Sequence, residues 1–229
     1  MVCRYFCGRN SKFIAAMYIP KINRHDQPDE VWRFIEANSF GLLISQVEGR
    51  PWATHIPILT AARPDGTMYL HGHLAKANPQ WRHWQTPDEI LAVFSGPHTY
   101  ISSSWYDHPN VPTWNYTAVH VYGKIRLIEG EELYASIKSL VDKYEAKSER
   151  PVSMENLPPD MIRREMRGVV GFEIDITEVQ AKEKLSQNRN DHNHTLIVNE
   201  LEKRNELFDA DIADQMKKKR NNLPATDKG

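Results

Sequence analysis

The sequence predicts a mainly β protein with added helices, an α+β fold built on a closed or nearly closed antiparallel barrel. Strand-like segments follow one another at short spacing between residues 40 and 128, and turn signals such as Glu48-Gly49-Arg50-Pro51 and Arg63-Pro64-Asp65-Gly66 separate them. The longer amphipathic helices come only after this run. Clustered strands with helices outside them favour an antiparallel barrel over a parallel α/β sheet.

The first predicted element is a short helix over residues 29–38. Asp26 and Pro28 are its start signals, and Val31, Phe34 and Ile35 lie on one face at helical spacing. This helix precedes the strands, so we expect it to pack on the outside of the barrel.

The predicted strands cover residues 40–47, 52–59, 68–73, 90–95, 98–102, 114–128 and 169–177. A short helix at residues 79–85 interrupts them. Two longer helices, residues 131–147 and 160–167, come before the last strand. A polar loop and a helical tail follow it.

Composition narrows the class of protein. The chain has 229 residues, of which 40% are hydrophobic, and a net charge of −1. It can therefore bury a sizeable core, and it has no general attraction to nucleic acid. No run of about 18 apolar residues that could cross a membrane is present. Cys3 and Cys7 lie in the first seven residues, which leaves the body without a disulfide framework and is consistent with a cytoplasmic location.

We expect three regions along the chain. Residues 1–16 lack the continuous apolar segment of a secretory signal and are expected to be a disordered extension, with Met17 as the natural start. Residues 17–180 are expected to form the barrel domain. Residues 181–229 are expected to form a C-terminal loop and helical tail that packs on the barrel or on a partner subunit.

An anion site is predicted where the third strand ends. Asn78 is a good N-cap and Pro79 suits the first helical position, so the free N–H groups of the following helix would point toward the loop that carries His73 and Lys76. A helix N-terminus, an ammonium and an imidazole together favour a phosphate. The alternative is an ordinary capped helix with a solvated lysine.

Aromatic rings alternate with hydroxyls and an amide over residues 96–106 and 111–116. Such side chains, among them Trp114, Asn115 and Tyr116, can stack on a planar heterocycle and bond its polar edge. The alternative is that they fill a barrel core and its rim. We also expect Trp105, Tyr106 and Trp114 to be exposed on a single barrel, and the large apolar patch that they would form predicts a dimer.

Two further clusters of side chains are candidates for binding sites. His71 and His73 stand two residues apart on a strand, but no acidic ligand follows and Lys76 would repel a cation, so no metal is expected. The basic run at residues 217–220 is a candidate contact for a phosphate backbone, although a solvated helix end is the commoner role of such a run.

Several motifs together resemble the PaiB-like family of FMN-binding negative transcriptional regulators, over roughly residues 17–220. Ser103 is a small departure, since the family pattern has a proline there. The segments that carry the resemblance are Met17-Tyr18-Ile19-Pro20, His71-Gly72-His73-Leu74-Ala75-Lys76-Ala77-Asn78-Pro79-Gln80-Trp81, Gly96-Pro97-His98-Thr99-Tyr100-Ile101-Ser102, Val111-Pro112-Thr113-Trp114-Asn115-Tyr116 and Lys184-Leu185-Ser186-Gln187-Asn188-Arg189.

The resemblance implies an antiparallel split barrel related to the pyridoxamine-phosphate oxidase fold, usually a homodimer with FMN at the subunit interface. Under it, Lys76 would hold the FMN phosphate together with His73 and Asn78, and the neighbouring His71 is included in the site. The other residues implied to bind FMN are Thr54, His55, Ile56 and Pro57 along the flavin, Trp114, Asn115 and Tyr116 near its ring, and Gln187, Asn188 and Arg189 closing the site.

Two classes of function remain open from the sequence. The first is a repressor in which FMN is a structural or sensing ligand. The second is a flavin-dependent oxidoreductase or a haem-handling enzyme on the same fold, although no nucleophile with an adjacent base stands out. No helix-turn-helix is recognisable, so direct DNA binding stays open and regulation could be indirect.

Overall fold

The computed structural model describes residues 17–84 and 89–222. They form two compact units, each described here by itself. The first unit contains Pro28–Phe94 and His120–Val179, and the second contains residues 17–27, Ser95–Val119 and residues 180–222. The predicted N-terminal extension, residues 1–16, lies outside the described residues.

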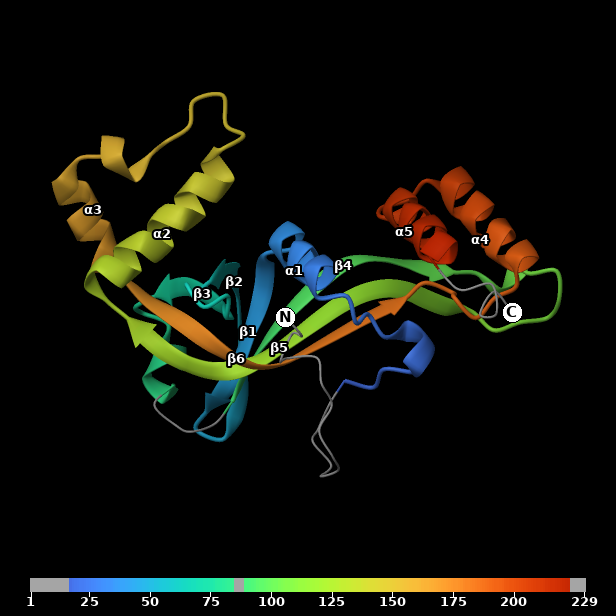
Figure 1. The fold of residues 1–229 in the computed structure, drawn as a ribbon, viewed down its shortest axis with the longest axis horizontal. Helices are drawn as coiled ribbons and strands as arrows, with labels where there is room; N and C mark the ends of the chain where they lie inside the picture. The colour runs from blue at the N-terminus through green and yellow to red at the C-terminus, as the bar shows by residue number, and fades with distance from the viewer. Residues whose placement is uncertain (1–16, 85–88, 223–229) are drawn as a thin grey trace. The chain divides into compact units, whose positions relative to one another are not determined.

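Six strands close into an antiparallel barrel in the order β1-β2-β3-β6-β5-β4 (Figure 1). Strands β1 to β3 belong wholly to the first unit, whereas β4, β5 and β6 each continue into the second. The predicted α+β fold with an antiparallel barrel is confirmed. The strands are β1 Phe40–Val47, β2 Arg50–Ala62, β3 Met68–Ala75, β4 Ile90–Ile101, β5 Thr113–Ile128 and β6 Val169–Lys184.

Alternation along the strands builds the core of the first unit, because every second side chain points inward. Close packing also needs a glycine, since a Cβ on Gly72 would lie 2.9 Å from the Phe172 ring and 3.0 Å from the Pro57 carbonyl oxygen. The helices of this unit are α1 Pro28–Ala37, α2 Gly130–Glu145 and α3 Pro159–Met166, with short 3-10 turns η2 Pro79–His83 and η4 Met154–Asn156. Large, fully buried side chains of the core include Leu43, Ile58, Leu70, Phe94, Phe172 and Ile174.

The second unit has its own core beneath two helices, α4 Asp191–Arg204 and α5 Asp209–Asn222, which lie side by side (Figure 1). Its remaining elements are the short turns η1 Lys21–Asn23 and η3 Ser103–Trp105. The Asp209 carboxylate is fully buried and accepts hydrogen bonds from Thr99 and Arg204, which holds the turn between α4 and α5 against β4. Its core consists of Ile101, Tyr106, Leu185, Ile197, Val198, Leu201, Ile212, Ala213 and Met216.

The largest differences from the predicted strand bounds lie in β4 and β6. We expected separate strands at residues 90–95 and 98–102, but β4 is continuous through Gly96-Pro97. The pairing of β1 with β4 covers Leu91–Val93, so Pro97 lies beyond the ladder with β1 and its missing N–H costs no hydrogen bond to that strand. The last strand, predicted to end at Thr177, continues to Lys184, four residues beyond the expected domain boundary at Gln180.

The helix predicted at residues 79–85 is a five-residue 3-10 turn, η2. Gln85, its expected last residue, lies outside the described residues. Asn78 does act as the cap, since its Oδ1 accepts a hydrogen bond of 3.0 Å from the Gln80 backbone N–H. A single short turn sums few aligned peptide dipoles, so the predicted helix dipole adds little to an anion site here.

Candidate functional site

The loop after β3 is held at the barrel by a network of uncharged side chains. Thr54 Oγ1 donates to Gln80 Oε1 at 2.6 Å and accepts from Asn78 Nδ2 at 3.0 Å. Gln80 is fully buried, and its Nε2 lies within hydrogen-bond distance of Leu43 O at 3.2 Å and Ser45 Oγ at 3.0 Å. Thr54 and Asn78 therefore position the loop together with Gln80. Spacing along the sequence did not indicate this role of Gln80.

Lys76 lies on this loop with an exposed side chain. Its backbone is anchored, because its N–H donates to Gly168 O at 2.8 Å and its carbonyl accepts from Trp81 Nε1 at 3.0 Å. Its ammonium has no hydrogen bond or ion pair within the described residues. The loop thus presents a free cation on a fixed backbone, which is the arrangement that a phosphate contact requires.

His71 and His73 differ in their surroundings. His71 is buried, its Nδ1 lies 2.8 Å from Ser136 Oγ on α2, and burial lowers its pKa to about 4. Burial also lowers the pKa of His73, whose buried Nδ1 has no hydrogen-bond partner among the described residues. Burial thus favours the neutral imidazole of His73, which offers an unused polar atom to a ligand.

The segment from Thr54 to Pro57 lies in β2. His55 is exposed and stacks on Phe40, with ring centroids 6.3 Å apart. Ile56 is buried and Pro57 is half-buried. Of these residues, only His55 has a ring largely open to solvent. The part of the chain that the structure describes contains no group of three His, Cys, Asp or Glu side chains able to hold a metal ion.

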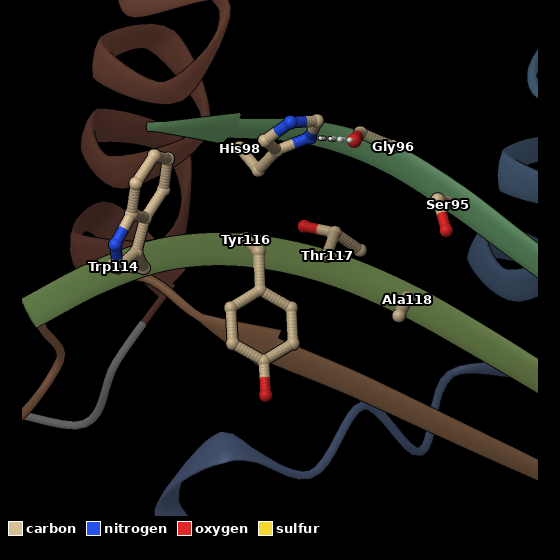
Figure 2. Close-up of a pocket in the computed structure, with 7 residues that line it drawn as sticks. All are labelled: Ser95, Gly96, His98, Trp114, Tyr116, Thr117 and Ala118. Carbon is tan, nitrogen blue, oxygen red and sulfur yellow. Dashed lines mark hydrogen bonds between the residues drawn. The ribbon is translucent and has the colours of Figure 1, made fainter. Parts of the chain in front are cut away.

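The other six predicted residues lie in the second unit, where Trp114 and Tyr116 line a cavity of about 260 Å³ (Figure 2). The Trp114 ring lies on the side of β5 toward β4, 6.3 Å from the His98 ring, and the Tyr116 ring lies on the other side. Trp114 is 53% exposed. The remaining lining residues are Ser95, Gly96, Thr117 and Ala118. The structure therefore adds His98, whose ring lies beside Trp114, and Ser95, which lies farther along β4 on the side of Ala118 (Figure 2).

Asn115 and Gln187 are not free to contact a ligand. Asn115 is fully buried, and its amide bonds Ser186 Oγ and Met216 Sδ. Gln187 is 3% exposed, and its amide bonds the backbone at Leu185 and Glu183. Asn188 is exposed, and the Arg189 guanidinium lies 5.0 Å from the Tyr106 ring centroid. In this turn, only Asn188 and Arg189 have side chains available to a ligand.

Two other expectations need correction. Tyr106 is 9% exposed and Trp105 packs on the core beneath α4 and α5, so only Trp114 of the three aromatics is open. Helices α4 and α5 cover Trp105 and Tyr106. Residue spacing along the sequence does not predict this burial. The basic run is also neutralised, because its four cations pair with carboxylates: Lys217 with Glu202, Lys218 with Asp214, Lys219 with Glu183 and Arg220 with Asp191.

The residues of each unit fit a different part of FMN. Lys76 and the unused Nδ1 of His73 suit a phosphate. The aromatic cavity beside Trp114 suits a planar ring. These observations concern the two units separately.

Comparison with solved structures identifies the class of fold. One neighbour is the FAD- and haem-binding protein of Mycobacterium smegmatis, with a TM-score of 0.53 and 11% identity, covering 71% of this chain and 73% of that one. Another is a conserved hypothetical protein of Mycobacterium tuberculosis, with a TM-score of 0.52 and 16% identity, covering 73% and 91%. At these identities the likeness shows a shared fold.

Sequence comparison gives the family. The model described as "Putative FMN-binding domain" matches residues 17–178, and the chain belongs to this family. It is also 43% identical over 186 residues to the protease synthase and sporulation protein PAI 2 of Bacillus subtilis, covering 81% of this chain and 89% of that protein. These matches confirm the relationship that the motifs predicted. No helix in the described residues is long and apolar enough to cross a membrane.

Proposed function

We propose that this protein binds FMN and acts as a negative regulator of transcription of the PaiB type. The main support is the family match over residues 17–178, together with a relative whose name joins protease synthase and sporulation. In this proposal FMN is a structural or sensing ligand. The cytoplasm is the expected compartment, as the scarcity of cysteine indicates.

In the proposed site, Lys76 contacts the FMN phosphate and His73 supplies a neutral hydrogen-bonding atom beside it. Thr54 and Asn78 orient this loop through Gln80, while Trp114 and Tyr116 receive a planar ring. When bound, FMN would supply a ring that accepts and releases electrons. Further candidates for FMN contacts are His55, Ile56, Pro57 and His71 in the first unit and, separately, Asn188 and Arg189 in the second. We also expect the protein to be a homodimer.

Direct reading of DNA is not part of this proposal. A four-residue turn joins α4 to α5, but the acidic residues in the first turn of α5 are Asp211 and the buried Asp209, which is paired with Arg204. The four cations at the end of α5 are paired with carboxylates, so this helix offers few free charges to phosphates. Repression through a partner protein or a flavin-dependent reaction is therefore the mechanism that we expect.

The second candidate is a flavin-dependent oxidoreductase or a haem-handling protein. It is favoured by the shared fold with the FAD- and haem-binding protein of Mycobacterium smegmatis, which is a fold-level argument only. An enzyme needs little beyond a positioned cofactor and access for a reductant, and the exposed Trp114 ring leaves such access.

One set of spectra tests both candidates. The purified protein is titrated with FMN and with haem, and each absorbance spectrum shows whether the added group is bound. Bound FMN that stays oxidised when NADH or NADPH is added supports the regulator, and rapid bleaching of its absorbance supports the oxidoreductase. A spectrum unchanged by FMN, with tight haem binding instead, would overturn the proposal.

A further inference from the structure

The turn between α4 and α5 holds Phe208 in a backbone conformation that suits few residue types. Its φ is 67°, in the left-handed region, where the Cβ of an ordinary residue crowds the backbone. Asn205 has a φ of 52° in the same turn, but asparagine tolerates this region and here ends α4, with its N–H donating to Leu201 O. Phe208 is therefore the strained position of the turn, and strain of this kind often marks a functional site.

A buried carboxylate next to Phe208 keeps the turn in this conformation. Asp209 is fully buried and accepts hydrogen bonds from Thr99 Oγ1 at 2.6 Å and from Arg204 Nε at 2.7 Å. It also accepts one of 3.0 Å from the Glu206 N–H. Burial raises the pKa of this carboxyl, but the hydrogen bonds from Arg204 and Thr99 lower the pKa further than burial raises it, so the carboxylate stays charged. These bonds fix the turn on both sides of Phe208.

The Phe208 ring lies against His98. Their ring centroids are 5.3 Å apart, and the His98 ring in turn lies 6.3 Å from the Trp114 ring in the wall of the aromatic cavity (Figure 2). The His98 side chain is exposed, and its Nδ1 lies 3.2 Å from the carbonyl oxygen of Gly96 on the same strand. Phe208 is thus the ring contact that reaches this imidazole from the helices and not from the strands.

This contact comes from a part of the chain beyond the family match. The family model matches residues 17–178, which include His98 and Trp114, whereas α4 and α5 follow that range. Phe208 does not line the cavity itself. The C-terminal helix pair therefore adds to the cavity wall a support that the family match does not assign.

We propose that Phe208 is a positioning residue of this cavity. The hydrogen bonds to Asp209 hold the Phe208 ring against His98, and that ring keeps the imidazole beside Trp114, where a planar ligand lies. Phe208 acts through His98 and does not contact the ligand. The inference rests on the proposed function in taking the flavin as that ligand.

A set of variants separates the ring, the backbone strain and the route through His98. Phe208→Ala removes the ring, Phe208→Tyr keeps it, and Phe208→Gly removes it while relaxing the left-handed backbone. His98→Ala is made alone and together with Phe208→Ala. Leu207→Ala, in the same turn and 78% exposed, is the control. The affinity of each folded variant for FMN and for riboflavin is measured by fluorescence titration.

We expect Phe208→Ala and Phe208→Gly to weaken FMN and riboflavin equally, by about fivefold, because the contact supports the ring and not the phosphate. Phe208→Tyr should retain most of the affinity, and Leu207→Ala should not change it. The double variant His98→Ala/Phe208→Ala should bind no more weakly than His98→Ala alone, because losses that pass through one contact do not add.

A second measurement does not depend on the flavin. In the FMN-free protein, nuclear Overhauser effects between the ring protons of His98 and Trp114 report whether the two rings stay together. We expect these signals in the unaltered protein and in Leu207→Ala, and their loss in Phe208→Ala. If Phe208→Ala does not fold, Phe208→Gly, whose backbone is relaxed, takes its place.

Unchanged flavin affinity in the folded Phe208→Ala variant would overturn the proposal. The same holds for His98–Trp114 signals that persist in this variant, and for losses that add in the double variant. Failure of both FMN and riboflavin to bind the unaltered protein would instead count against the proposed function. In that case the signals between His98 and Trp114 in the FMN-free protein decide the present proposal.

Discussion

Thr54 Oγ1 donates a hydrogen bond of 2.6 Å to Oε1 of Gln80, which joins β2 to the loop that carries Lys76. Gln80 is fully buried and satisfied at both ends of its amide. The position of the proposed phosphate contact therefore depends on an uncharged residue that contacts no ligand. This arrangement separates two roles, holding the loop and binding the anion, that mutations can distinguish.

Replacing Gln80 should destabilise the barrel. Gln80→Leu removes the acceptor of the Thr54 hydroxyl proton and the donors to the Leu43 carbonyl and Ser45 Oγ, which we expect to cost about 2 to 4 kcal/mol in free energy of unfolding. Urea denaturation measures this. The exposed Gln46→Leu, on β1, is the control and should change stability little. Equal stability of Gln80→Leu and the unaltered protein would show that the network is not structural.

Replacing Lys76 should affect binding and leave stability unchanged. Its ammonium has no partner in the described part of the chain, so Lys76→Ala removes only a contact to the ligand. We expect FMN affinity to fall by about one to two decades, or roughly 1.5 to 3 kcal/mol, with riboflavin affinity little changed. Lys76→Arg should retain most of the affinity. Equal losses for FMN and riboflavin in a fluorescence titration would rule out the phosphate contact.

Stability should fall in mild acid because of His71. Its pKa is about 4 when folded, below the ordinary value of 6.5. Between these values the unfolded chain binds a proton that the folded chain does not, so stability present above pH 6.5 is lost as the pH falls. We expect His71→Gln to reduce the loss between pH 7 and 4.5 by on the order of 2 kcal/mol.

Chemical denaturation at the two pH values measures this effect of His71→Gln. The same change at His55, which is exposed on β2, serves as the control. If both variants lose stability with pH as the unaltered protein does, His71 is not the group responsible. Burial also lowers the pKa of His73, His120 and His194, so part of the acid sensitivity should remain in either case.

We expect the protein to be a homodimer. The exposed rings of Trp114 in the second unit and Phe40 in the first are apolar surface that a second copy could cover. Light scattering at micromolar concentration, with FMN present, should give twice the mass of one chain. A single-chain mass under these conditions would contradict the dimer.

The basic run should matter little for DNA binding. Lys217 and Lys218 pair with Glu202 and Asp214, so removing both charges leaves few contacts to lose. We expect Lys217→Ala/Lys218→Ala to bind duplex DNA with nearly the same salt dependence as the unaltered protein. Arg220 is left in place because it is buried. A decrease of about two in the slope of log affinity against log salt would mean that both lysines contact phosphates.

Much of the fold could be predicted because the signals are local. An apolar run bounded by a turn signal predicts β1, whose bounds match the expected residues 40–47, and the expected helix at residues 29–38 corresponds to α1, Pro28–Ala37. The continuity of β4 was missed because Pro97 is a strong local breaker, and only the register with β1 shows that its missing N–H is harmless.

The sequence by itself determined the kind of protein: a mainly β chain with outer helices, and motifs that identify an FMN-binding family. Only the tertiary structure decided which of the predicted site residues have side chains exposed enough to contact a ligand. Asn115, Gln187 and Tyr106 are buried by segments distant in sequence, and the basic run meets carboxylates on other elements. Burial and ion pairing depend on distances between elements, whereas strand alternation and capping depend on neighbours along the chain.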